Sequence, residues 1–177
     1  MCIRDKLAGE PAVLCYENVR GMRNPLYTIV AMIKVFQKFP KARLHIYNVQ
    51  DKKMYETFSA YIKHAKLWPF VRSLTGPVDM KNINLLLNKA DIVVSNLFPL
   101  YARSIEAFGA GKPLVCAGYK EYSDYPYLCD MNPDSIADAI IKAWEEQGKH
   151  NWRKYAEERH DAKESTRQCL EIYKRYL

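Results

Sequence analysis

The alternation of short apolar runs with amphipathic helical patterns constrains the fold of this chain more than any other feature. Short apolar runs bounded by turn signals are typical of buried strands, and apolar residues spaced three or four apart are typical of helices packed on a core. Strands and helices that alternate in this way form a parallel sheet with helices on its faces. The sequence therefore predicts a single α/β domain whose parallel sheet has about six strands, flanked by helices.

The expected elements follow one another without a linker or an internal repeat. Strands are predicted at residues 12–16, 42–49, 70–74, 91–95, 112–117 and 127–129. Helices are predicted from Asn24-Pro25 up to Pro40, at 52–66, after a cap at Asp79, at 102–110, from Asn132-Pro133 to Gly148, and from Trp152 to the end. We treat residues 1–177 as one domain, with 1–11 as a leader segment and 150–177 as a C-terminal helix.

Composition places the chain among soluble globular domains, with 49% hydrophobic and 27% charged residues. No apolar run approaches the roughly 20 residues that a membrane-spanning helix needs. The first residues are too charged for a signal peptide. We therefore expect a cytoplasmic protein.

The five cysteines and four histidines are dispersed, without a CxxC pair or a zinc-like spacing. Cys15, Cys116 and Cys129 stand in apolar runs, where a free thiol behaves as a small hydrophobic group. The sequence thus predicts no metal site, no metal cofactor and no disulfide framework.

The formal net charge of +7 favours anionic partners. Much of it, however, lies on helix surfaces and in the C-terminal segment. Because no RNA-binding aromatic signature or helix-turn-helix pattern accompanies the charge, nucleic acid is not expected. Peripheral contact with an anionic membrane surface stays open.

Three loops are expected at the carboxyl ends of strands, where open α/β sheets bind ligands. The loop 17–24 carries Arg20 and Arg23 just before a helix, an arrangement that suits a phosphate or pyrophosphate, although a solvated turn is the alternative. The loop 95–104 leads into a short helix. The third loop, 117–124, is polar and aromatic and includes Glu121.

The short helix offers two kinds of ligand contact. Ser104 is expected at or inside its first turn, whose free N–H groups would face an anion. Glu106 could accept hydrogen bonds from vicinal hydroxyls, since a carboxylate accepts two donors. The alternative is that Glu106 complements the helix dipole.

The run Ser-Ile-Glu-Ala-Phe-Gly-Ala-Gly-Lys-Pro-Leu-Val at 104–115 resembles a signature of the retaining glycosyltransferases of family 4 (glycosyl transferases group 1). Three further segments resemble that family in the same order: Ala-Arg-Leu-His-Ile-Tyr at 42–47, Leu-Thr-Gly-Pro-Val at 74–78 and Lys-Ala-Asp-Ile-Val-Val-Ser at 89–95. The similarity extends over roughly residues 12 to 147. It implies a Rossmann-like domain, the C-terminal half of a GT-B fold.

The resemblance also implies a function. This domain would bind a UDP- or GDP-sugar donor for transfer with retained anomeric configuration, and a separate N-terminal domain, missing from this chain, would hold the acceptor. Glu106 would bind the ribose, and the N–H groups of Ser104 and Ile105 would contact the phosphates. Arg20 and Arg23 would be catalytic, because cations stabilise charge on the departing diphosphate. Phe98 and Glu121 complete the donor-binding set.

The chain departs from the family pattern at several positions. Phe98 stands eight residues before Glu106, where the family has another Glu, and Arg20 and Arg23 are more closely spaced than the family's Arg and Lys. The missing half leaves three explanations: a fragment, a partner subunit that supplies it, or a domain that binds without transfer. The last corresponds to a second hypothesis, a non-catalytic module for a nucleotide or phosphorylated metabolite. In either case this domain alone is expected to be inactive.

Overall fold

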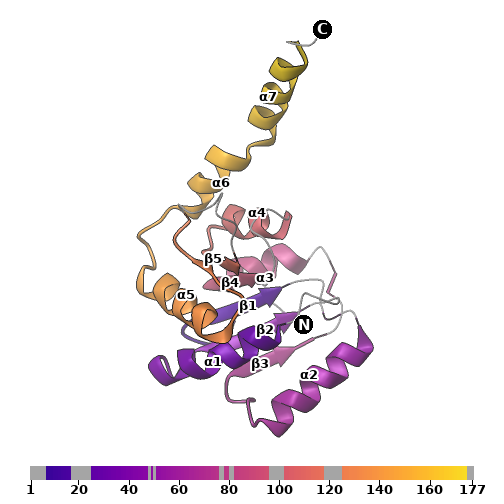
Figure 1. The fold of residues 1–177 in the computed structure, drawn as a ribbon, viewed down its shortest axis with the longest axis vertical. Helices are drawn as coiled ribbons and strands as arrows, with labels where there is room; N and C mark the ends of the chain where they lie inside the picture. The colour runs from indigo at the N-terminus through magenta and orange to yellow at the C-terminus, as the bar shows by residue number, and fades with distance from the viewer. Residues whose placement is uncertain are drawn as a thin grey trace.

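Figure 1 shows the computed structural model of the chain. The structure describes residues 7–16, 25–47, 49, 51–75, 78–79, 82–95, 102–117 and 125–174. Six parallel strands form one sheet, and helices pack against it. The predicted α/β class and the six-stranded parallel sheet are confirmed.

The sheet has the strand order β3-β2-β1-β4-β5-β6. Its strands are β1 (Ala12–Tyr16), β2 (Arg43–Tyr47), β3 (Val71–Leu74), β4 (Ile92–Ser95), β5 (Leu114–Ala117) and β6 (Leu128–Cys129). From β1 the chain first builds outward through β2 to β3, and it then returns to the other side of β1 for β4. The direction of building therefore reverses between β1 and β4, which are paired in the middle of the sheet.

The structure describes helices between and after the strands. They are α1 (Leu26–Lys38), α2 (Lys52–His64), α3 (Ile83–Lys89), α4 (Ala102–Gly109), α5 (Pro133–Glu145), α6 (Trp152–His160) and α7 (Ala162–Lys174). The helix pair α1 and α5 lies side by side on one face, while α3 and α4 cover the other and α6 packs on α4 (Figure 1). Right-handed crossovers before and after the reversal put the helices on opposite faces.

The core is centred on the two middle strands. Val13, Leu14 and Cys15 of β1 are almost fully buried, and every residue of β4 is buried. Strands covered on both faces have this continuous apolar character. The prediction that Cys15 and Cys116 pack as hydrophobic groups is confirmed, and burial raises the pKa of the half-buried Cys129 to about 12.

The helical spacing of Leu26, Ile29, Val30, Ile33 and Phe36 in the sequence predicts one buried stripe, but α1 packs on the core through a different one. Ile29 is buried as expected, but Ile33 is 37% exposed, and Met32 and Val35 take part in the core instead. The helix packs against both the sheet and α5, so its buried arc includes the smaller Thr28. The spacing was helical, but the centre of the stripe was misplaced.

Helix capping agrees with the prediction at α5 and differs at α3. Asn132 precedes Pro133, and its side-chain oxygen accepts a hydrogen bond from the Ser135 N–H at 2.8 Å. The N-cap of α3 is Asn82 rather than Asp79, whose main-chain carbonyl accepts from the Asn82 N–H at 2.9 Å. Asp79 thus starts the turn before α3, and a side-chain cap from Asp79 stays a prediction, because residues 80 and 81 lie outside the described residues.

The predicted single helix from Trp152 onward is also wrong, because the chain breaks at Asp161. The backbone of Asp161 is extended (φ −66°, ψ 117°), and its carboxylate accepts from the Lys163 N–H at 2.7 Å. An Asp in this position starts a new helix. The resulting α7 extends away from the sheet (Figure 1), and none of its residues is buried.

Residues 7–11, which the sequence analysis grouped with a leader segment, are bonded to the amino edge of the sheet. The N–H groups of Leu7 and Glu10 donate to the carbonyls of Lys89 and Lys41. The Nε2 atom of the buried His45 lies 2.7 Å from the Ala8 carbonyl. Since a carbonyl can only accept, the proton of His45 is on Nε2.

Candidate functional site

The candidate functional site lies where the strand order changes direction, between β1 and β4. Strands β1 and β4 are paired in parallel, with Cys15 opposite Val94, and they end at Tyr16 and Ser95. The chain therefore leaves both strands at the same edge of the sheet. In open α/β folds such a reversal leaves a crevice at the carboxyl ends of the strands, where ligands bind.

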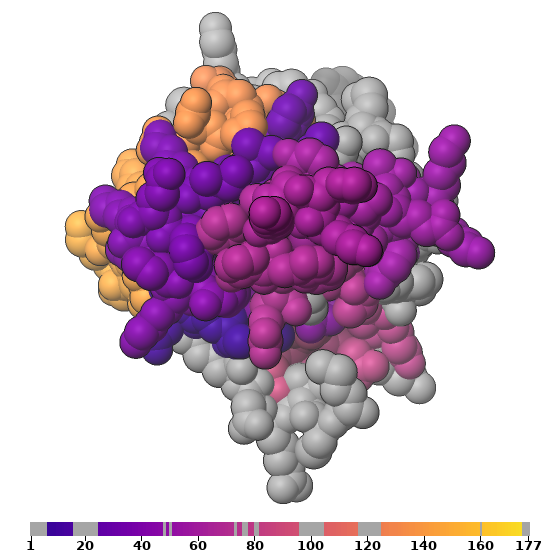
Figure 2. All heavy atoms as spheres, turned by 90° about the horizontal axis from the view of Figure 1, so that it is seen from below, coloured from indigo at the N-terminus to yellow at the C-terminus, as the bar shows by residue number. Residues whose placement is uncertain are grey.

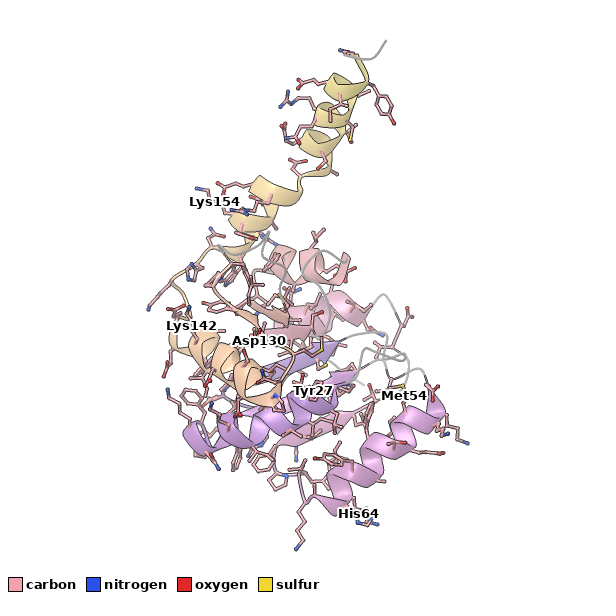
Figure 3. The ribbon with its side chains drawn as sticks, viewed as in Figure 1. Tyr27, Met54, His64, Asp130, Lys142 and Lys154 are labelled. Atoms are coloured by element: carbon pink, nitrogen blue, oxygen red, sulfur yellow. The ribbon has the colours of Figure 1, made fainter. Side chains whose placement is uncertain are left out.

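Figure 3 locates this edge. Tyr27 lies in the first turn of α1, Met54 in the first turn of α2, and Asp130 immediately after β6. In parallel α/β units the first turns of the helices lie near the carboxyl ends of the strands. His64, at the far end of α2, lies toward the opposite edge. Helix N-termini thus converge on the carboxyl edge, and their free N–H groups favour anions.

Four of the predicted site residues lie outside the described residues. Arg20 and Arg23 belong to residues 17–24. Phe98 belongs to residues 96–101, and Glu121 belongs to residues 118–124. The segments 17–24 and 96–101 follow the paired strands β1 and β4 directly. The roles of all four residues stay predictions.

The other three predicted residues share helix α4. Ser104 is the third residue of α4 and therefore lies in its first turn, where backbone N–H groups lack an intrahelical acceptor. Ile105 and Glu106 follow, and both side chains are half-buried. The next two residues, Ala107 and Phe108, are buried and attach α4 to the core.

The C-terminal end of α4 is closed by a Schellman motif. The Gly111 N–H donates to the Phe108 carbonyl at 2.8 Å, and the Lys112 N–H donates to the Ala107 carbonyl at 3.0 Å. Gly111 has φ +73°, a conformation that glycine adopts without strain. The Gly-Lys-Pro segment of the family-like run therefore ends a helix.

An aromatic cluster fixes α4 from the outside. We use this name for Phe108, Tyr125, Tyr127, Trp152 and Tyr155. The Phe108 ring lies 5.1 Å from that of Tyr155 and is stacked on that of Trp152 at 6.0 Å. Arg153 adds a hydrogen bond from Nε to the Gly109 carbonyl at 3.2 Å. Helix α6 thus holds α4 through its last turn, which leaves the first turn directed to the carboxyl edge.

Tyr125 is a structural residue that the sequence analysis missed. Its hydroxyl donates to the Leu114 carbonyl at 2.6 Å and accepts from the Leu114 N–H at 2.8 Å, so it takes the place of a strand partner at the start of β5. Burial raises the pKa of Tyr125 well above its usual value, so the hydroxyl keeps its proton. Tyrosines recur at 125 and 127 in the sequence, but their spacing does not reveal this contact.

Asp91, within the family-like segment 89–95, has a similar structural role. Its Oδ2 atom accepts from the Ala12 N–H at 2.9 Å, and its own N–H donates to the Ala12 carbonyl at 2.9 Å. Asp91 is 8% exposed. It therefore joins β1 to β4 at their amino ends, away from the candidate site.

The described residues contain neither a metal-binding cluster nor a membrane-spanning helix. No group of three or more His, Cys, Asp or Glu side chains in the described part of the chain is arranged to hold a metal ion. Nor is any helix in the described ranges long and apolar enough to cross a membrane.

Comparison with solved structures shows what this fold resembles. Residues covering 92% of the chain superpose on S. aureus TarM, solved with UDP, with a TM-score of 0.74 and 18% identity. Anabaena HepE, solved with UDP and glucose, matches 93% of the chain with a TM-score of 0.72 and 17% identity. The C-terminal domain of LpcC, a glycosyl transferase group 1 family protein of Francisella tularensis, matches 87% with a TM-score of 0.70 and 16% identity.

The coverage of these neighbours differs. The chain spans 35% of TarM and 48% of HepE, but 88% of the LpcC domain. No protein-family profile matches the sequence, and no curated protein matches it by sequence. The neighbours are GT-B glycosyltransferases, and the six-stranded parallel α/β fold of this chain matches that of their C-terminal domains.

Proposed function

We propose that this chain is the nucleotide-sugar-binding domain of a retaining glycosyltransferase of family 4. The observation that carries the proposal is the position of the family-like run at 104–115. Its first residues form the opening turns of α4, which follows β4, and β4 is the strand at which the sheet reverses. A helix N-terminus beside a strand reversal is the usual place for a nucleotide diphosphate in an α/β fold.

In the proposed complex, α4 binds the donor through its first turns. The N–H groups of Ser104 and Ile105 donate to the phosphates, and the Glu106 carboxylate accepts from the ribose hydroxyls. The Schellman motif and the aromatic cluster hold α4 in place without using these groups. Such preorganisation lowers the entropic cost of binding.

The proposed chemistry needs cations beside the leaving group. Arg20 and Arg23 would stabilise the charge that develops on the diphosphate, and neither a metal ion nor another cofactor is required for this. Phe98 and Glu121 would lie on the donor side. Supporting this assignment, β1 and β4 are paired, and residues 17–24 and 96–101 are the segments that follow them in the sequence.

We propose that a second domain holds the acceptor, either in a longer polypeptide or in a partner subunit. The chain spans about half or less of TarM and HepE, which supports this proposal.

Peripheral contact with anionic lipid is proposed from the charge of +7. Co-sedimentation with phosphatidylserine vesicles at low salt would support that contact, and its absence would contradict it.

One observation favours a second function, that of a binding module without transfer activity. Phe98 occupies the position at which the resemblance calls for a Glu, and a phenyl ring cannot accept hydrogen bonds from a sugar. Adding an N-terminal domain from a matching enzyme distinguishes the two. Transfer from a UDP- or GDP-sugar supports the enzyme, and binding without transfer supports the module.

Calorimetric titration with UDP- and GDP-sugars tests the binding site. Removing a hydrogen bond to a charged group costs about 1.5–3 kcal/mol, so Arg23→Ala and Glu106→Gln should each weaken binding by roughly tenfold to a hundredfold. The matched controls are Lys163→Ala on α7 and Glu56→Gln on α2, two exposed positions.

The controls should leave the dissociation constant unchanged. If the folded wild-type chain binds no nucleotide sugar, the proposed function is wrong. If Arg23→Ala and Glu106→Gln bind like the wild type, the domain binds nucleotide sugar but the residue assignments are wrong.

A further inference from the structure

A polar cavity lies at the amino edge of the sheet, opposite to the proposed nucleotide site. Its volume is about 540 Å³, and it is lined by residues 7–10 before β1, by Lys41 and Arg43 at the start of β2, and by Arg72 in β3. Figure 2 looks onto the side of the molecule formed by α1, α2 and the residues around β3, in violet and magenta. Nothing in the proposed function uses this cavity.

The charge of the cavity is unbalanced. Its lining contains three cationic side chains and one carboxylate, and Lys41 Nζ lies 3.4 Å from Glu10 Oε2. Among the described residues, the guanidinium group of Arg72 makes no hydrogen bond or ion pair. The guanidinium group of Arg72 lines the cavity and has no carboxylate partner among the described residues, so it is available to an external anion.

Arg43 is already held in one orientation. Its Nη1 donates to the carbonyls of Pro40 at 2.8 Å and Ala42 at 2.7 Å, and its guanidinium carbon lies 5.4 Å from the centre of the Phe36 ring. A guanidinium has five N–H donors, so three remain after these two bonds. Because the side chain is fixed, an incoming anion would not have to order it.

The backbone that packs against Arg43 is fixed as well. Gly9 has φ +121°, and a Cβ atom there would lie 2.8 Å from Arg43 Cβ and 2.9 Å from Arg43 N. The neighbouring Ala8 carbonyl accepts from the buried His45 ring, and the Glu10 N–H donates to Lys41. The backbone of residues 8–10 therefore lies close against β2 and gives the cavity a defined shape.

We propose that this cavity binds a phosphate group, with Arg72 and Arg43 as its main hydrogen-bond donors. Arginine recognises phosphate oxygens through paired N–H donors, which suits two guanidinium groups on adjacent strands. The cavity has room beyond the phosphate for the group that carries it. The phosphate belongs either to a soluble metabolite or to a lipid headgroup.

His45 provides a reporter inside the protein. Burial chiefly lowers the pKa of His45, and the charge of Arg72 lowers it further. An anion bound to Arg72 would offset that repulsion and raise the pKa again. A phosphate bound at the carboxyl edge, at the opposite end of the strands, would leave His45 unaffected.

The experiment is an NMR titration of the full chain with inorganic phosphate at low salt, with sodium chloride at equal ionic strength as reference. We expect saturable shifts at Gly9, Arg43 and Arg72 and a raised His45 pKa in phosphate. Arg72 is exposed, so Arg72→Gln should leave the fold intact. The substitution removes charged donors and should raise the dissociation constant for phosphate about tenfold or more. Lys163→Gln on α7 removes the same charge elsewhere and should bind like the wild type.

A second arm uses phosphatidylcholine vesicles with and without phosphatidate. Binding that needs phosphatidate and Arg72 assigns the phosphate to a lipid headgroup, whereas saturable binding of free phosphate assigns it to a soluble molecule. Shifts in phosphate that equal those in chloride, with no Arg72-dependent vesicle binding, would overturn the proposal. So would phosphate or vesicle binding that Arg72→Gln leaves unchanged.

Discussion

The two edges of the sheet differ in what holds their residues. At the amino edge, side chains hydrogen-bond to the main chain: Asp91 to Ala12 at the start of β1, and His45 of β2 to Ala8 in the segment before β1. At the carboxyl edge, β1 and β4 pass into residues 17–24 and 96–101, which carry Arg20, Arg23 and Phe98 among the predicted ligand contacts. The amino edge holds the fold together, and the carboxyl edge is where we propose that the donor binds.

The family-like segments contain both structural residues and proposed ligand contacts. Asp91 and Gly111 belong to those segments, yet one joins two strands and the other ends a helix. Ser104 and Glu106 belong to the same run, but they lie in the first turns of α4. A resemblance in these segments therefore carries the fold more directly than the activity, and substitutions at the two edges should have separable effects.

The largest expected effect on stability is that of Asp91→Ala. It leaves the buried Ala12 N–H without its side-chain acceptor, and we expect the free energy of unfolding to fall by about 2–3 kcal/mol. Urea denaturation measures this change. Asp134→Ala, at a side chain that is 88% exposed, should change it by less than about 0.5 kcal/mol. Nucleotide-sugar affinity of folded Asp91→Ala should stay near the wild-type value, and a large loss of affinity would contradict the separation of the two edges.

Tyr125→Phe should have the next largest effect. The substitution leaves both main-chain groups of Leu114 without their partner, so we expect a loss of about 2 kcal/mol in unfolding free energy. Tyr61→Phe, at a partly exposed residue of α2, is the control and should be near neutral. Equal stability of the two variants would show that the Tyr125 hydroxyl does not support β5.

Two glycines near the end of α4 should respond in opposite directions. Gly111→Ala forces a side chain into φ +73° and should cost about 1 kcal/mol, whereas Gly109→Ala lies within the helix and should stabilise by about 0.5–1 kcal/mol. A Cβ atom at either position meets nothing within 4 Å, so the difference reports backbone conformation alone. Thermal unfolding of both variants checks it, and shifts of the same sign would argue against the Schellman motif.

The last expected effect is the pH dependence of stability that arises from His45. Burial, followed by the charge of Arg72, lowers its pKa in the folded state, so the unfolded state binds more protons just below the ordinary value of 6.5. Stability should therefore decline as the pH falls below about 6.5, by at most about 1.4 kcal/mol per pH unit, and this contribution should be flat above neutrality. Urea denaturation between pH 5 and 8 measures it. His45→Gln should reduce the decline, and an unchanged decline would assign it to other groups.

The sequence predicted the order and type of most elements because their periodicity is local. Apolar runs such as 91–95 identified the strands, and Asn132-Pro133 identified a helix start. The errors arose where one signal had two interpretations. The charged segment after Trp152 suggested one helix, yet Asp161 caps a second. Ile33 matched the helical period of α1, but tertiary packing decided which arc is buried.

The site was less predictable than the fold. That α4 follows the strand beside the reversal depends on the strand order, which local patterns do not specify. The contact between Tyr125 and Leu114 likewise depends on how a loop returns to the sheet. The cavity around Arg72 joins residues from three separate segments, and no short motif contains them. The roles of Arg20, Arg23, Phe98 and Glu121 stay predictions.

Amide chemical-shift mapping with a UDP- or GDP-sugar tests the central claim most directly, because it compares both edges in one sample. We predict that the shifts gather at residues 102–106 and at those following β1 and β4, while Ala12, Asp91 and Arg72 are unaffected. Shifts that gather around Arg43 and Arg72 instead, with α4 unaffected, would contradict the account.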